Sequence, residues 1–298
     1  MPRVILASLL LVLLAACGED RLVERPPEPS VTETFEQERA TRLDILFVID
    51  NSRSMQEEQA ALASNFARFL AYIDPDTQRV GEPNEVDYRI AITTTDANRT
   101  GGRLVTAKDA PAPDIIRPST SYDPLDVVQR TIGNIKEGGA LETGFEAAAM
   151  ALERLADRTL DGEPAFLRED AWLYVVIVTD EDDASFGEVH YWYRRFESLK
   201  GRGNENTVAI SAIVGDVPDG CGDVAEPGTR YAELAALTGG VHGSICTDDW
   251  GATLEQLAVS GLGLRKRFQL RDFPRDLMPP DGIGAEDFLA LRVIYPCE

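Results

Sequence analysis

The feature that most constrains the fold is an unbroken apolar run at positions 45–49, which ends at Asp50. The run is short, rich in β-branched residues and bounded by an aspartate on each side. This pattern is typical of a strand that is buried on both faces, as in a parallel sheet with helices on either side. Ligands bind outside the carboxyl ends of such strands, so Asp50 lies where a binding site is expected.

The rest of the chain alternates between strand and helix patterns. Strands are predicted at 87–95, 173–179 and 207–214, and helices at 56–73, 125–135, 143–156, 189–200 and 230–237, with an elaborated loop at 97–122. This alternation predicts an α/β fold with a doubly wound, mostly parallel central sheet flanked by helices. The pattern changes after residue 262, and residues 263–298 are predicted to form a small C-terminal β appendage.

Three segments carry the oxygen ligands of a possible metal site. The first is D-x-S-x-S, with Asp50, Ser52 and Ser54, directly after the buried run. The second segment is another buried strand, which ends at Asp180. The third is a glycine-rich loop that opens an alanine-rich helix and contains Glu142 and Thr143. Carboxylate and hydroxyl oxygens are hard donors, which favour Mg²⁺, Ca²⁺ or Mn²⁺ over zinc or copper.

These motifs resemble the von Willebrand factor type A family, whose metal-ion-dependent adhesion site joins a D-x-S-x-S loop to a threonine and an aspartate of two later loops. The resemblance covers roughly residues 44–262 and implies that Asp180 supplies the aspartate. Alignment of the helix places Glu142 where the threonine usually stands, with Thr143 one residue later, so either residue could close the site. Three carboxylates around the ion would favour Ca²⁺. Glu142 could also fill the position that a partner's carboxylate takes in adhesion-type relatives.

The amino terminus predicts the compartment. A short apolar run at 4–16 leads into Leu-Ala-Ala-Cys-Gly, which is typical of a secretory signal and is too short to span a membrane stably. The ending resembles a bacterial lipobox, which implies a signal peptide at 1–16 and a lipidated Cys17; the alternative is a plain signal peptide with an incidental cysteine. Residues 17–42 are predicted to be a disordered tether. We therefore expect a lipid-anchored protein of the bacterial cell envelope, at the outer membrane or the periplasmic face.

Charge and cysteine content narrow the partners and the covalent structure. The chain has 51 acidic and 29 basic residues, a net charge of −22 and no basic tract, which excludes nucleic acid as an expected partner. With Cys17 lipidated, we predict a disulfide between Cys221 and Cys246, and Cys297 remains as a free thiol or an intermolecular link. The alternative is three unpaired thiols, which is uncommon in a secreted chain.

Three classes of function fit these observations. The predicted one is a metal-dependent binding module for a protein or glycan ligand, a role that the resemblance implies. The alternatives are a scaffold in which the ion only pins the loops, and a metal-assisted hydrolase. The hydrolase ranks last because the chain offers no evident nucleophile or general base: His190 and His242 are far apart in sequence. Residues 181–183, after Asp180, are predicted to be a solvated loop.

Overall fold

The computed structural model describes residues 40–74, 86–108, 113–139, 141–160, 163–201, 204, 207–222 and 224–262. Their centre is a sheet of five strands in the order β2-β1-β5-β6-β7. All neighbouring strands in this sheet are parallel. The strands are β1 (Arg42–Ile49), β2 (Asp87–Thr94), β5 (Trp172–Val178), β6 (Val208–Val214) and β7 (His242–Ser244). The predicted doubly wound α/β fold is confirmed.

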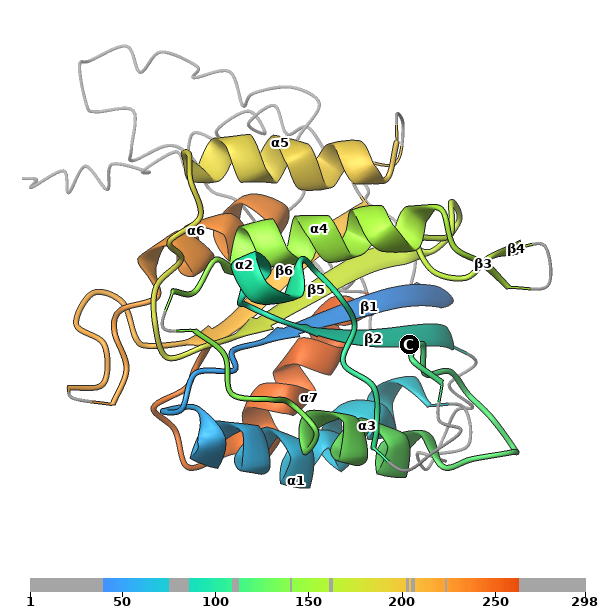
Figure 1. Ribbon diagram of the computed structural model, residues 1–298, viewed down its shortest axis with the longest axis horizontal. Helices are drawn as coiled ribbons and strands as arrows, with labels where there is room; N and C mark the ends of the chain where they lie inside the picture. The colour runs from blue at the N-terminus through green and yellow to red at the C-terminus, as the bar shows by residue number, and fades with distance from the viewer. Residues whose placement is uncertain are drawn as a thin grey trace, which may run out of the picture. The chain divides into compact units, whose positions relative to one another are not determined.

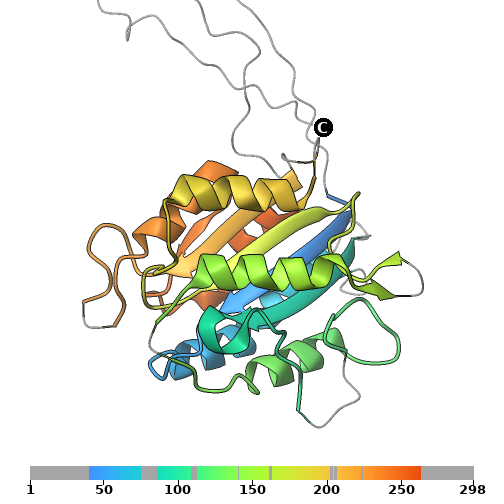
Figure 2. The ribbon, with the colours of Figure 1, turned by 45° about the horizontal axis from the view of Figure 1, so that its top comes forward.

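Helices cover both faces of the sheet (Figure 1, Figure 2). One face carries α1 (Gln56–Ile73), α3 (Pro124–Ile132) and α7 (Trp250–Gly261). The other carries α2 (Ala97–Thr100), α4 (Gly144–Ala156), α5 (Val189–Leu199) and α6 (Thr229–Thr238). A two-stranded hairpin of β3 (Thr159–Leu160) and β4 (Glu163–Pro164) follows α4.

The unbroken apolar run of β1 is buried on both faces, as predicted, because its side chains fill two different cores. Phe47 packs against Phe66 and Phe69 of α1, with ring centroids 5.1 and 5.4 Å apart. Leu46 and Val48 point to the opposite core, which the alanine-rich α4 lines. Every side chain of the run is fully buried, so no position tolerates a polar residue until the strand ends.

Some element boundaries differ from the predictions. The helix α3 ends at Ile132 rather than at residue 135, because Gly133 follows it directly. The predicted loop at 97–122 contains the short helix α2 and a bridge between Ile90 and Ile116. The helix α7 was not predicted from the sequence, and it contains two glycines. It begins after Asp249, whose carboxylate accepts a hydrogen bond from the Ala252 amide as an N-cap.

Several predicted features lie outside the described residues: the signal peptide, Cys17, almost all of the tether, the C-terminal appendage and Cys297. The strand β1 begins at Arg42, the last residue assigned to the tether. Within the described ranges, none of the helices has the length and apolar character needed to cross a membrane.

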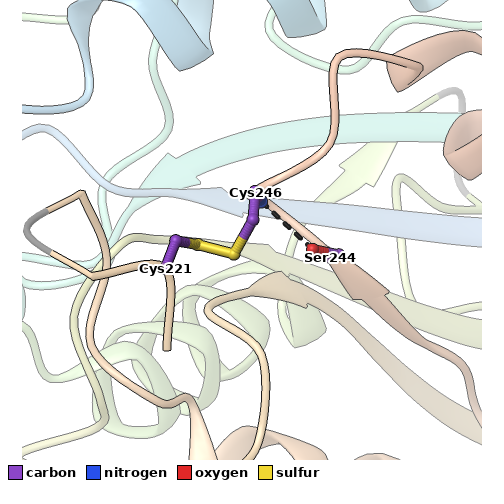
Figure 3. The surroundings of a disulfide bond; sticks show 3 residues. All are labelled: Cys221, Ser244 and Cys246. Carbon is purple, nitrogen blue, oxygen red and sulfur yellow. Dashed lines mark hydrogen bonds between the residues drawn. A yellow bond between two sulfur atoms is a disulfide. The ribbon is translucent and has the colours of Figure 1, made fainter. Parts of the chain in front are cut away.

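The predicted disulfide is present and joins two loops on the β6 side of the sheet (Figure 3). Cys221 lies between β6 and α6, and Cys246 follows β7. Their Cα atoms are 5.6 Å apart, within the usual range for a disulfide. The Cys246 amide donates to the Ser244 hydroxyl at 3.1 Å. The bridge therefore fixes the loop that leads into α6.

The amino end of β1 holds a buried ion pair. Asp44 is fully buried and accepts hydrogen bonds from the Arg168 amide at 2.6 Å and from its Nε at 2.8 Å. The same guanidinium donates to the carbonyl oxygens of Leu43 and Asp87 at 3.0 and 2.9 Å. The ammonium of Lys200 donates to the Ala171 carbonyl oxygen nearby at 2.7 Å. The chain itself thus neutralises the carboxylate at this end of the strand.

Candidate functional site

The loop after β1 holds the D-x-S-x-S side chains at the carboxyl edge of the sheet, on the left in Figure 1. Asp50 is fully buried, and its amide donates to the Val178 carbonyl oxygen of β5 at 2.8 Å. Its two carboxylate oxygens accept hydrogen bonds from the Ser52 amide and the Thr179 hydroxyl, both at 2.6 Å. The hydroxyl oxygens of Ser52 and Ser54 lie 3.0 Å apart, so both can face one small cation.

Hydrogen bonds fasten the glycine-rich loop before α4 to the ends of β1 and β2. The Gly138 amide donates to the Asn51 carbonyl oxygen at 2.8 Å, and the Asn51 side chain donates to the Lys136 carbonyl oxygen at 2.9 Å. The Gly139 amide donates to the Asp96 carboxylate at 2.8 Å. A Cβ on Gly138 would lie 2.3 Å from the Asn51 side chain, so only glycine permits this approach.

Glu142 and Thr143, at the end of this loop, make different contacts. The Glu142 carboxylate is 1% exposed and accepts a hydrogen bond from the Thr95 hydroxyl. Its other oxygen has no hydrogen-bond partner within the described residues. The Thr143 hydroxyl donates to the Thr95 carbonyl oxygen at 3.3 Å, next to the first turn of α4. Glu142 therefore retains an oxygen that a cation could use.

Asp180 lies just beyond β5, beside the end of β1. It is 6% exposed, and one of its carboxylate oxygens is buried without a hydrogen-bond partner in the described part of the chain. The Glu226 amide donates to the Asp180 carbonyl oxygen at 2.8 Å, which ties this position to the loop that carries the disulfide. Asp180, like Glu142, thus combines burial with an unused oxygen.

The prediction of a solvated loop at 181–183 is wrong for Asp183. This side chain is buried and accepts hydrogen bonds from the Phe145 amide at 3.2 Å and the Ser185 hydroxyl at 2.8 Å. It also forms an ion pair with Arg230 of α6 at 3.2 Å. Asp183 therefore anchors the first turn of α4 to α6, which a reading of the acidic run as surface charge misses.

Three other residues that support the site were not identified from the sequence. Thr179 and Thr95 donate hydroxyl hydrogen bonds to the carboxylates of Asp50 and Glu142. The side-chain amide of Gln59 in α1 donates to the Asp50 carbonyl oxygen at 2.6 Å. The position of the two threonines, one residue beyond the ends of β5 and β2, was the available signal, because polar side chains there meet at one edge of a parallel sheet.

Burial without a cationic partner dominates the electrostatics of the site. Burial raises the pKa of Asp50 to about 6, and the charge of Asp180 adds to the rise. Burial and the nearby Asp50 charge raise the pKa of Glu142 to about 8. Within the described ranges, no basic side chain forms an ion pair with the carboxylates of Asp50, Glu142 or Asp180. A bound cation would favour the charged form of each carboxylate.

The donor set fits a hard divalent cation, with one restriction. Buried unpaired oxygens of Glu142 and Asp180 and adjacent hydroxyls of Ser52 and Ser54 are the ligand types that Mg²⁺, Ca²⁺ and Mn²⁺ prefer. Among the residues that the structure describes, no three His, Cys, Asp or Glu side chains gather closely enough to hold a metal ion by themselves. An ion here would therefore need the serine hydroxyls as well as carboxylates.

Comparison with known sequences finds no match to any family model or curated protein. Solved structures match over about three quarters of the chain at low identity. Proximal thread matrix protein 1 from the mussel byssus is 13% identical, with a TM-score of 0.42 over 75% of this chain and 49% of that one. A second structure of that protein, with a zinc-occupied MIDAS motif, is 14% identical, with a TM-score of 0.40 over 74% and 46%.

Two further solved structures match in the same way. The ArnB paralog VWA2 from Sulfolobus acidocaldarius is 15% identical, with a TM-score of 0.38 over 74% of this chain and 46% of that chain. The pilus adhesin SpaC from Lactobacillus rhamnosus GG is 12% identical, with a TM-score of 0.45 over 76% and 31%. This chain spans less than half the length of each of these proteins. The all-parallel sheet, with the D-x-S-x-S loop at the carboxyl end of β1, is the doubly wound α/β architecture that the sequence resemblance to the von Willebrand factor type A family implies.

Proposed function

We propose that this protein is a binding module of the bacterial cell envelope that holds a divalent cation at the carboxyl edge of its sheet and engages a protein or glycan ligand there. The supporting observation is the pair of buried, unpaired carboxylate oxygens on Glu142 and Asp180, beside the adjacent hydroxyls of Ser52 and Ser54. Buried polar atoms without partners are uncommon in folded proteins, and a bound ion is one of their ordinary explanations.

Each residue has a proposed role toward the ion. Ser52 and Ser54 are direct ligands, Asp50 and Asp180 bind directly or through water, and Glu142 or Thr143 closes the site. When bound, the cation supplies an electrophilic position that an oxygen of the ligand can occupy. The hydrogen bonds from the Ser52 amide and the Thr179 hydroxyl hold the Asp50 carboxylate in place for this role.

The proposal includes the location of the protein. A lipid on Cys17 and the tether at 17–42 would anchor the folded part to the membrane while leaving the carboxyl edge accessible to a ligand. The anchor would be the only membrane contact, since a surface with a net charge of −22 is repelled by anionic lipids and by nucleic acid. We propose no enzymatic activity.

A scaffold without a functional ion is the second candidate, and two observations favour it. Both oxygens of Asp50 already have hydrogen-bond partners within the protein. The described residues also lack a cluster of three His, Cys, Asp or Glu side chains suited to a metal. Under this alternative the loops would be joined by their own hydrogen bonds, and addition of a cation would change nothing.

The test is cation-dependent capture of a ligand. The protein from Gly18 onward, without Cys17, is immobilised and exposed to solubilised envelope proteins and to envelope glycans in Mg²⁺, in Ca²⁺ and in EDTA. The proposal expects capture that requires the cation and is lost in Asp50→Ala, while Asp126→Ala, which removes an exposed carboxylate on α3, captures normally. Capture that is equal in EDTA and in cation would contradict the proposal.

A further inference from the structure

A small cavity lies away from the candidate metal centre, beside the last turns of α4. It has a volume of about 190 Å³, and three arginines, Arg103, Arg154 and Arg158, line it together with a single acid, Asp114. Arg154 lies in α4, Arg158 is the second residue beyond its end, and Arg103 follows α2. Three guanidinium groups beside one carboxylate give this site a local positive charge on a chain whose net charge is −22.

The one acid in this cavity is already neutralised. The two terminal nitrogens of the Arg158 guanidinium, Nη1 and Nη2, donate to the two oxygens of the Asp114 carboxylate at 2.9 and 3.1 Å. Arg103 and Arg154 have no ion-pair partner among the described residues, unlike Arg158. The cavity therefore retains two positive charges that the structure does not balance.

The backbone holds this cavity in shape. The Nε of Arg154 donates to the Gly101 carbonyl oxygen, which fixes the guanidinium against the loop. Gly101 and Gly102 have φ of 57° and 69°, a conformation that favours glycine. A Cβ on Gly102 would lie 2.4 Å from the Ala151 amide nitrogen, so only glycine lets this loop lie directly on α4. These contacts hold the backbone of the loop and the Arg154 guanidinium in place, while the side chains of Arg103 and Arg154 both remain exposed to solvent.

We infer that this cavity binds a small phosphate-class oxyanion. Guanidinium groups present planar pairs of donors that match phosphate oxygens, and this pairing is stronger than an ordinary hydrogen bond. The volume of about 190 Å³ is below the range of pockets for drug-sized ligands, and the cavity is open to solvent, so an inorganic ion or the phosphate end of a small monoester fits it. The site is independent of the proposed metal centre.

The competing explanation is structural. Arginines near the C-terminal end of a helix stabilise the helix dipole, whether or not an anion binds. The two explanations differ in one measurable respect, because a dipole effect is present without phosphate, whereas a binding site responds to phosphate in a saturable way.

The test is a titration of the protein from Gly18 onward with inorganic phosphate, at a constant ionic strength set with NaCl. Calorimetry measures binding, and thermal unfolding without phosphate checks that each variant is folded. A separate arm with glycerol phosphate distinguishes a monoester from the free ion. The variants are Arg103→Gln and Arg154→Gln, with Arg154→Lys as the conservative change and Arg194→Gln on α5 as the matched control.

The inference expects saturable one-site binding that weakens at least tenfold in Arg103→Gln and in Arg154→Gln, with partial recovery in Arg154→Lys. Arg194→Gln, which removes a 77% exposed arginine outside the cavity, should bind phosphate like the wild type. Absence of saturable binding by the wild type would overturn the inference, and so would an equal loss in the control. Loss of stability in the variants together with unchanged phosphate binding would assign the arginines to the helix dipole alone.

Discussion

Each end of β1 buries an aspartate, but only the aspartate at the amino end has a cationic partner among the described residues. Asp44 and Asp50 are both fully buried. At the amino end, Asp44 receives two hydrogen bonds from Arg168, which is itself 3% exposed. At the carboxyl end, the hydrogen bonds that Asp50 receives within the described residues come from neutral groups, the amide of Ser52 and the hydroxyl of Thr179 among them. Burial raises the pKa of both groups, but only at Asp44 does a guanidinium oppose the rise.

This difference separates a carboxylate that the fold completes from one that it leaves incomplete. A buried charge is costly unless it is paired, so a structural aspartate is expected to carry its own counter-ion, as Asp44 does with Arg168. Asp50, Glu142 and Asp180 have no such partner among the described residues. We interpret the carboxyl end as a site whose missing positive charge comes from outside the chain, consistent with the proposed divalent cation.

The largest effect should come from removing the partner of Asp44. Arg168→Met leaves a buried aspartate unpaired, and loss of one partner of a buried pair typically costs about 3–5 kcal/mol of unfolding free energy. Asp50→Asn should cost less than about 1 kcal/mol, because asparagine retains an acceptor and removes an unpaired charge. Urea unfolding in EDTA measures both.

The matched control for Arg168→Met is Arg130→Met, which breaks an exposed pair with Asp126 at 2.7 Å. An exposed pair contributes at most about 1 kcal/mol, so this variant should unfold close to the wild type. The comparison of the two ends would fail if Asp50→Asn destabilised the protein as strongly as Arg168→Met.

Removal of the disulfide should lower the overall stability and, in addition, loosen the carboxyl end locally. The bridge closes a loop of 25 residues, and its loss in Cys221→Ser/Cys246→Ser should cost about 3 kcal/mol by the loop-entropy argument. The loop also supplies the amide of Glu226, which donates to the Asp180 carbonyl oxygen at 2.8 Å. Hydrogen exchange should therefore speed up around Asp180. Acceleration near Asp44 as large as that around Asp180, under conditions where exchange occurs by local opening, would show that the two ends are not independent.

A smaller effect is expected from pH. The pKa of Asp50, about 6, and that of Glu142, about 8, lie above their ordinary values of 3.8 and 4.5. Between the ordinary and the raised pKa of each group, the folded protein binds more protons than the unfolded chain. The free energy of unfolding in EDTA should therefore fall as the pH rises from about 4 to about 8. Glu142→Gln should make this fall shallower, because glutamine binds no proton in this pH range.

Thermal unfolding at several pH values in EDTA measures this slope for the wild type and for Glu142→Gln. The matched control is Glu153→Gln, an exposed carboxylate of α4, which should follow the wild type. A stability profile of Glu142→Gln that parallels the wild type would mean that Glu142 is not the buried proton-binding group described here.

The sequence was sufficient for the fold and for part of the site. A short apolar run without polar alternation indicates burial on both faces, and β1 and β5 both follow this rule. The placement of Asp50 and Asp180 beyond these strands followed from parallel topology. The pairing of Cys221 with Cys246 was also predicted, since both flank the last helix and strand of the sheet.

The remaining features depend on contacts between distant segments, which a local pattern does not reveal. The partner of Asp44 is 124 residues away, and Asp183 meets Arg230 across 47 residues. Asp183 was misjudged because an acidic run is ordinarily solvated, and only the docking of α6 makes this member of the run structural. The arginine-lined cavity is likewise formed by segments whose charges look unremarkable in sequence.

The most direct test of the central claim is a calorimetric titration of the protein from Gly18 onward, without Cys17, with Mg²⁺, Mn²⁺ and Ca²⁺, beside Asp50→Ala and Glu142→Thr. The account predicts saturable binding at one site, its loss in Asp50→Ala while the fold is kept, and an altered ion preference in Glu142→Thr. Absence of binding by the wild type, or binding that persists in Asp50→Ala, would contradict the claim that the carboxyl end of β1 is completed by an external cation.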